Sequence, residues 1–270
     1  MTTLAYQREV VDYLKAEDPA VWQWFAKRQT DDGSQAAAVR LDLLKSTYRL
    51  ERQTQPNLYA LVEEVAAKLG LNLPITLYQA QHPQGLNASI AYLPGEVHLV
   101  LSGPLATALT TTELKAVFGH ELAHRLLWEE REGDYRIAAH VLDALANDPA
   151  ATPVYAATAR LFALYTELFC DRAAWLVTGD LAATVATLVK VSTELTEVSA
   201  ESYLRQADEI FSQQDARTEG VSHPETYIRA RALRLWTEQG DEAGAAISAM
   251  LEGPLALEEL DLLGQRRVAA

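Results

Sequence analysis

Two histidines and a glutamate near the middle of the chain have the types and spacing of a metal-dependent hydrolytic site. They belong to the run His120-Glu121-Leu122-Ala123-His124. On an α-helix, residues four apart lie about 40° apart around the axis and about 6 Å apart along it, so both imidazoles can reach one metal ion. Glu121 projects beside that ion, where its carboxylate can hold a water molecule. The pattern predicts two metal ligands and a catalytic base within one helical turn.

The residues around this motif favour a metal site over a helix that merely carries two surface histidines. The motif alone is moderately specific. However, Val117 and Phe118 precede it and Leu126 and Leu127 follow it, which predicts a largely buried helix. Polar side chains on a buried helix need partners, because an unpaired polar group there costs several kcal/mol. A bound metal ion would be such a partner.

A third candidate ligand lies further along the chain. Catalytic zinc usually has three protein ligands and one open position. Glu167 and Asp171 are also four residues apart, and the helical stretch around them is otherwise apolar. Glu167 can bind metal while Asp171 accepts a hydrogen bond from a ligand histidine, which fixes the histidine tautomer. The alternative, two solvated acids, is weakened by the apolar neighbours.

These residues and two further motifs resemble the HtpX and CAAX prenyl protease family of gluzincin zinc metallopeptidases. The resemblance covers residues 56–240, and the chain carries no counterpart of the membrane helices of the best-known members. Four motifs occur in the family's order: Asn87-Ala88, the run from His120 to His124, Glu167 with Asp171, and His223-Pro224 followed by Arg229.

For the metal site, the resemblance implies a role for each matched residue. His120, His124 and Glu167 would bind one zinc ion per chain. Glu121 would be the general base and then the proton donor. Asp171 would orient a ligand histidine. The implied activity is that of a zinc endopeptidase, and the implied fold is the zincin-like (gluzincin) fold.

For the substrate, the resemblance implies that an extended protein or peptide binds beside the metal. Asn87, Ala88 and the next residue, Ser89, would pair with the substrate backbone as an added strand. Ser89 stands where the family often has an aromatic residue, so one contact is expected to differ. His223 would stabilise the oxyanion. Arg229 would brace the third ligand or the wall of the metal site.

The elements that must position these residues are mostly helical. Apolar residues at spacings of three and four predict helices within residues 4–50 and at about 56–69, 110–129, 133–147, 153–178, 181–196, 200–214, 224–239 and 241–265. Short β-branched segments at 75–79, 88–92 and 96–101 predict a small, mostly antiparallel sheet. The predicted fold is α+β and helix-dominated, with an active-site helix that starts at a capping box of Thr110 and Glu113.

The same periodicity gives a domain organisation. We expect an N-terminal helical segment at 1–55, a metallopeptidase core at 56–240 and a C-terminal helical tail at 241–270. Within the first segment, the run Asp31-Asp32-Gly33-Ser34 predicts a helix break. The aromatic cluster Trp22, Trp24 and Phe25 is expected to pack in the core, and Leu41, Leu44 and Tyr48 to continue a helical stripe.

Composition narrows the partners and the compartment. The chain has 37 acidic and 23 basic residues and a net charge of −14, which disfavours nucleic acid as a partner. Its one cysteine, Cys170, excludes an internal disulfide and is expected to be a small buried apolar residue rather than a metal-bound or redox-sensing thiol. No apolar run is long enough for a signal peptide or a membrane span. The protein is predicted to be soluble and cytoplasmic.

Three hypotheses remain open at this level. The leading one is a zinc endopeptidase that acts on soluble or unfolded proteins and peptides. The alternative is a catalytically idle, zinc-containing module that binds or regulates peptides, although the base Glu121 and the oxyanion donor His223 are both present. The third is a structural helical protein in which the motif occurs by chance.

Overall fold

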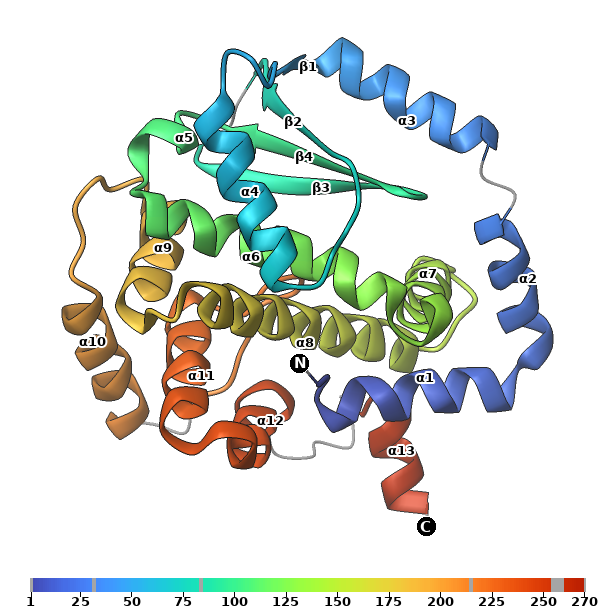
Figure 1. The fold of residues 1–270 in the computed structure, drawn as a ribbon. Coiled ribbons are helices and arrows are strands. Elements are labelled where there is room, and N and C mark those ends of the chain that lie inside the picture. The colour runs from blue at the N-terminus through green and yellow to red at the C-terminus, as the bar shows by residue number, and fades with distance from the viewer. Residues whose placement is uncertain (1, 31–32, 83–84, 214–215, 254–259, 270) are drawn as a thin grey trace. The chain divides into compact units, whose positions relative to one another are not determined.

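Helices dominate the computed structural model, which describes residues 2–30, 33–82, 85–213, 216–253 and 260–269 (Figure 1). The helices are α1 (Ala5–Glu17), α2 (Pro19–Thr30), α3 (Gly33–Ser46), α4 (Pro56–Lys68), α5 (Leu105–Ala108), α6 (Thr111–Glu129), α7 (Asp134–Ala146), α8 (Pro153–Thr178), α9 (Leu181–Thr193), α10 (Ala200–Gln213), α11 (Thr226–Gln239), α12 (Gly244–Glu252) and α13 (Leu262–Ala269), with 3-10 turns η1 (Glu130–Gly133) and η2 (Gly240–Ala243). The strands are β1 (Thr47–Arg49), β2 (Ile75–Ala80), β3 (Asn87–Leu93) and β4 (Glu96–Ser102). The helix-dominated α+β prediction is confirmed.

The chain divides into two compact units. Unit 1 comprises Met1–Asp31, Leu127–Phe169 and Glu209–Ala270, and unit 2 comprises Asp32–Leu126 and Cys170–Asp208. The divisions fall inside α6, α8 and α10, so each of these helices contributes residues to both units. Within the part of the chain that the structure describes, no helix is long and apolar enough to cross a lipid bilayer.

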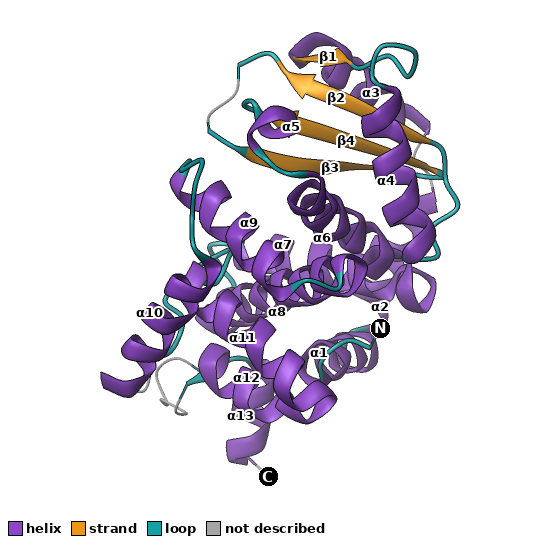
Figure 2. Cartoon of the chain, turned by 60° about the vertical axis from the view of Figure 1, so that its left-hand side comes forward, coloured by secondary structure: helices purple, strands orange, loops and turns teal. Residues whose placement is uncertain are grey.

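Unit 2 contains the sheet, whose strand order is β1-β2-β4-β3 (Figure 2). β2 and β4 are parallel, whereas the β1–β2 and β3–β4 pairs are antiparallel. The prediction of a mostly antiparallel sheet is therefore correct. β3 and β4 form a hairpin that turns at Gly95, where a φ of +72° suits glycine. β3 lies at the edge of the sheet.

One apolar core joins this sheet to α4 and α6. Alternate residues of a strand point to the same face, and three alternate residues of β4 are buried together here. The core includes Val97, Leu99 and Leu101 of β4, Leu58, Val62 and Val65 of α4, and Val117, Phe118 and Leu122 of α6. The residues just before the histidine motif thus anchor α6 against the sheet, and their burial agrees with the sequence prediction of a largely buried helix.

The start of α6 is fixed by hydrogen bonds and a buried ion pair. The Thr110 backbone N–H donates to Glu113 Oε2 at 2.8 Å, and the Glu113 N–H donates to Thr110 Oγ1 at 3.3 Å, which confirms the capping box. Lys190 Nζ of α9 lies 2.9 Å from Glu113 Oε1. Burial alone would raise the pKa of Glu113, but the bonds from Lys190 and Thr110 outweigh it and lower this pKa below 4.5.

Arg125, one residue beyond His124, ties α6 to the β3–β4 hairpin. Its side chain is 1% exposed and is the largest of the fully buried side chains that the structure describes. The guanidinium donates to the Leu93 carbonyl at 2.8 Å and lies 4.3 Å from the centre of the Tyr92 ring. Because both partners belong to β3, the edge strand is held to the helix that carries the histidines.

Unit 1 is helical and packs α1 against α2 and α7. Tyr6 of α1 stacks on Tyr165 of α8 with ring centres 4.6 Å apart. The Tyr6 hydroxyl donates to Asp261 at 2.6 Å, and burial together with this carboxylate raises the pKa of Tyr6. Lys15 forms an ion pair with the nearly buried Asp134 at the start of α7, at 2.9 Å. These contacts connect segments far apart in the sequence.

Several predictions about the first fifty residues are wrong. Tyr48 does not extend a helix, because α3 ends at Ser46 and Tyr48 pairs in β1 with Gln79 of β2. Leu41 and Leu44 are exposed rather than part of a buried stripe. Trp22 is buried as predicted, but Trp24 is 51% exposed.

Two further predictions concern residues outside the part of the chain that the structure describes. The helix break at Asp31-Asp32 falls on such residues. The predicted tail helix at 241–265 is replaced by η2, α12 and α13, and residues 254–259 between the last two are outside the described part.

Replacing Glu113 by Gln tests the buried ion pair. Gln can still accept the Thr110 bond, but Lys190 is left without its countercharge, and breaking such a buried pair costs about 3 kcal/mol. A carboxyl whose pKa is lower in the folded than in the unfolded chain stabilises the fold above the unfolded pKa. That contribution is lost as the pH falls through the folded pKa. We expect Glu113→Gln to lower the free energy of unfolding most at neutral pH and least once the pH has fallen below the lowered pKa of folded Glu113.

Urea unfolding, followed by tryptophan fluorescence across this pH range, measures the effect. Glu64→Gln is the matched control, because Glu64 also pairs with lysines (Lys115 at 2.6 Å and Lys68 at 3.4 Å) but is exposed. It should change little. An equal loss of stability in both variants, or a Glu113→Gln loss that is independent of pH, would contradict the prediction.

Candidate metal centre

The two histidines of the motif lie side by side on α6 within unit 2. Their ring centres are 5.2 Å apart, and the ring planes meet at 78°. Both side chains are partly exposed, whereas Glu121 between them is buried at 8% exposure. The helix therefore presents two imidazoles together, and the carboxylate of the predicted base belongs to the same turn.

Gly119 lets α6 approach the end of α8 closely. A Cβ atom at this position would lie 2.5 Å from Val177 Cγ2 and 3.0 Å from the Cα of Ala174. Both distances are shorter than an ordinary van der Waals contact of a Cβ atom. The Cα of Ala174 belongs to the backbone, so it cannot move aside by rotation about a side-chain bond. Sequence reasoning missed this residue. The available signal was a glycine inside a predicted helix, which costs about 1 kcal/mol relative to alanine and usually has a packing reason.

Across this close contact, His120 meets Asp171 of α8. The His120 Nδ1 atom lies 3.0 Å from Asp171 Oδ1, and the Asp171 side chain is 1% exposed. When Nδ1 donates to a carboxylate, the Nε2 atom becomes the nitrogen that can coordinate a metal. The structure thus brings together the two residues for which this relationship was predicted.

Cys170, which precedes Asp171, joins the two histidines. One ligand atom from each of His120, His124 and Cys170 can be chosen so that all three lie within 4.8 Å of one another. Cys170 is fully buried, as predicted for a small apolar residue, but its sulfur is also beside the imidazoles. Imidazole nitrogen and thiolate sulfur are both common zinc ligands, so this donor set fits a zinc ion.

Three further predicted residues of the site, Glu167, His223 and Arg229, meet in unit 1. Glu167 of α8 is 6% exposed. Its Oε2 atom lies 3.4 Å from His223 Nε2 and 3.7 Å from Arg229 Nη2. His223 is 59% exposed, and its Nδ1 atom lies 2.9 Å from the hydroxyl of Ser222. Two positive or protonatable groups therefore face the carboxylate predicted as the third ligand.

Asn87, Ala88 and Ser89 form the first half of the edge strand β3. The Asn87 side chain accepts a hydrogen bond from the Ala88 N–H at 2.8 Å. Asn87 and Ser89 are exposed, and Ala88 packs partly against the core of unit 2. On one side these residues pair with β4, where Ser89 lies opposite Val100. An edge strand of this kind can accept an additional strand on its other side.

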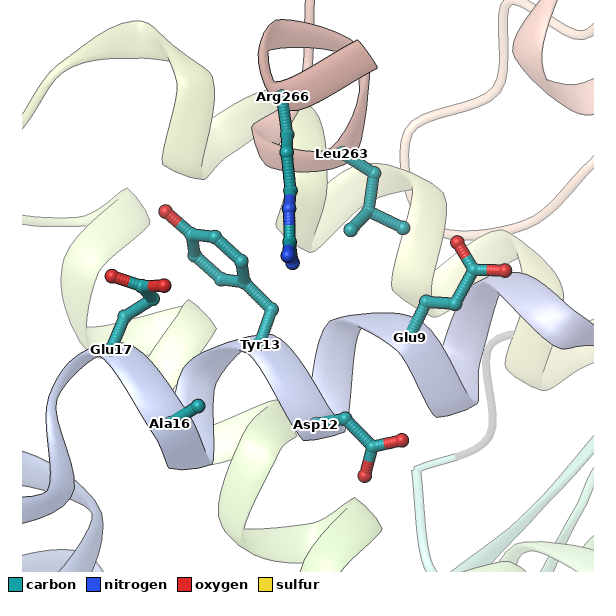
Figure 3. Close-up of a pocket in the computed structure, with 7 residues that line it drawn as sticks. All are labelled: Glu9, Asp12, Tyr13, Ala16, Glu17, Leu263 and Arg266. Atoms are coloured by element: carbon teal, nitrogen blue, oxygen red, sulfur yellow. The ribbon is translucent and has the colours of Figure 1, made fainter. Parts of the chain in front are cut away.

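A separate hollow in unit 1 lies between α1 and α13 and has a volume of about 480 Å³ (Figure 3). The side chain of Arg266 points into it between Tyr13 and Leu263. Glu9, Asp12, Ala16 and Glu17 complete the lining. The residues predicted for the metal site are not among those that line this hollow.

Comparisons with known proteins found similarity to peptidases. The model of a family described as peptidase family M48 matches residues 52–237. A curated relative, the plastoglobule-localized metallopeptidase 48, chloroplastic, of Arabidopsis thaliana, is 27% identical over 214 residues. That match covers 73% of this chain and 61% of the relative. No solved structure matches the chain significantly.

Replacing Asp171 by Asn tests its bond to His120. The Asn amide lacks the negative charge that the Asp171 carboxylate offers to the imidazole N–H. Losing such a partner of a metal-binding histidine weakens metal affinity by about 10–100-fold. We expect that loss for Asp171→Asn in a zinc competition titration against a chelating indicator. Asp180→Asn is the control, because Asp180 caps α9 and Asn is an equally good cap. Zinc affinity within twofold of the unmodified chain in Asp171→Asn would show that the bond does not tune a ligand.

Proposed function

Because the chain belongs to peptidase family M48, we propose that it is a zinc-dependent endopeptidase that cleaves soluble or unfolded proteins and peptides. The observation that carries the proposal is the pairing of His120 with the buried Asp171 while His124 lies beside it. A surface helix with two chance histidines would have no reason to bury a carboxylate against one of them. A metal-binding helix does, because the carboxylate fixes the tautomer of the ligand.

The proposed ligands are His120, His124 and Glu167. Glu167 and Asp171 are four residues apart on the continuous helix α8, so both project from the same side of it. Two imidazoles and a carboxylate form a donor set that suits zinc and leaves a position open for catalysis. In this proposal, Arg229 holds the Glu167 carboxylate in place from 3.7 Å.

The residues of the chain would then divide the chemistry of peptide hydrolysis. Bound zinc would act as a Lewis acid towards the scissile carbonyl and water. Glu121 would remove a proton from the attacking water and then deliver it to the leaving amine. His223 would donate a hydrogen bond to the oxyanion that develops at the carbonyl. Asp171 would keep His120 oriented throughout.

The substrate would bind as an extended strand along the edge of β3. Its backbone would hydrogen-bond to β3 at Asn87, Ala88 and Ser89, and this mode recognises main chain more than sequence. Substrates that are unfolded or have flexible segments can adopt the extended form at little cost. The name of the relative locates that protein in chloroplast plastoglobules. For this chain we propose the cytoplasm, and fractionation of cells that recovers it elsewhere would contradict this.

The first test of the mechanism is Glu121→Gln. The amide cannot accept a proton, and removing a general base typically lowers kcat by about 10²–10⁴-fold. The zinc content should stay at one ion per chain, because Glu121 is not a ligand. Cleavage of a casein-type unfolded substrate and metal analysis of the same samples measure both quantities. Glu129→Gln, at the exposed end of the same helix, is the control and should cleave normally.

Glu167→Gln separates the ligand from the base. This variant should lose zinc as well as activity, whereas Glu121→Gln should lose activity alone. If Glu121→Gln cleaves within threefold of the unmodified chain, the assigned base is wrong. Stoichiometric zinc without cleavage of any unfolded protein or peptide by the unmodified chain would favour the idle zinc-containing module instead.

A further inference from the structure

We propose that the sulfur of Cys170 is an additional metal ligand. Together with His120 and His124, it can hold the ion within unit 2. When bound, the sulfur occupies the coordination position that hydrolysis needs. The inference rests on the proposed function, because it concerns the same metal. It starts from the three ligand atoms that lie within 4.8 Å of one another.

The distances are close to those that coordination requires. Zinc–nitrogen bonds of about 2.0–2.1 Å and zinc–sulfur bonds of about 2.3 Å, at tetrahedral angles, place neighbouring ligand atoms about 3.3–3.6 Å apart. The observed limit of 4.8 Å exceeds this by little more than 1 Å. In this proposal, rotations about the side-chain bonds of Cys170 and His124 close that gap when the ion binds.

The surrounding contacts orient His120 and fix the two helices that carry the ligand atoms. Asp171, the residue next to Cys170, is bonded to His120, so one short segment of α8 both orients an imidazole and supplies the sulfur. The close contact of Gly119 with Ala174 fixes α6 against the same segment. A preorganised site of this kind loses little conformational entropy when the metal binds.

The chemistry of sulfur favours binding over simple packing. A thiol binds zinc as the thiolate, so coordination forms one S–Zn bond and releases the S–H proton to solvent. Soft thiolate ligands select zinc, and they hold cadmium and cobalt(II) as well. A fully buried cysteine with no role beyond packing would have no reason to lie beside two imidazoles.

The consequence is a form of the site in which the metal has no open coordination position. His120, His124, Glu167 and Cys170 would fill the four positions of a tetrahedral ion and leave none for water, as in structural zinc sites. Withdrawal of the sulfur alone would open the catalytic position. The thiolate thus acts as a built-in ligand that competes with water and substrate for the metal.

Cobalt(II) substitution tests the proposal without relying on activity. Thiolate–cobalt bonds absorb in the near ultraviolet, whereas imidazole and carboxylate ligands give only the weaker visible bands. Since Cys170 is the single cysteine of the chain, a thiolate band in the cobalt-loaded protein can come from no other residue. We expect this band in the unmodified protein, and we expect Cys170→Ser and Cys170→Ala to lose it while keeping the visible bands.

Two further measurements complete the experiment. Cobalt affinity should fall about tenfold or more in both variants, the scale of one lost coordinate bond. Hydrolysis of an unfolded substrate by the zinc-loaded variants should rise at least twofold, because the open position is no longer contested. Ala173→Ser changes a buried small residue of the same helix and is the control for packing. It should keep the thiolate band.

The outcomes separate this inference from the proposed function. Visible cobalt bands and peptidase activity without a thiolate band in the unmodified protein would overturn the role of Cys170 and leave the peptidase intact. Failure of the protein to take up any cobalt or zinc would overturn both. Because the spectrum of the unmodified protein already decides between these outcomes, a variant that fails to fold does not weaken the test.

Discussion

The hydrogen bond between His120 and the buried Asp171 is the contact on which the proposed chemistry depends. It forms where Gly119 allows α6 to lie close to Ala174 and Val177 of α8. It also needs α6 to begin at a fixed residue, which the Thr110–Glu113 box and Lys190 provide. A buried charge of this kind adds little net stability and is retained for the geometry it imposes.

Successive residues of α6 supply a proposed metal ligand and a contact with the edge strand. His124 is the proposed ligand, and Arg125 directly after it fixes the β3 end of the hairpin through the Leu93 carbonyl. The substrate strand proposed at β3 would therefore be positioned by the same turn of helix that positions the ligands. Since a misplacement of about 1 Å can cost a factor of about 100 in rate, such direct coupling has an evident use.

The elements that the sequence predicted well are those with strong local signals. The periodicity of α8 and the capping box of α6 act over a few residues, and each was predicted close to its observed position. β1 was missed because a three-residue strand carries no pattern of its own and forms only by pairing with β2. Trp24 was predicted to be buried because aromatic residues are buried more often than not. Trp24 does not follow this statistical expectation, because its side chain is exposed.

Cys170 shows how an ordinary explanation can hide a candidate metal ligand. Cys170 and Asp171 follow Glu167 by three and four residues on one helix. The helical periodicity that places the two acids on one face therefore places the cysteine there as well. Composition favoured burial, and the structure confirms burial, but burial and metal binding do not exclude each other. Cys170 lies one helical turn before Ala174, which Gly119 of α6 approaches closely. Among small residues, cysteine alone brings a soft donor atom to that position, which makes its identity chemically meaningful.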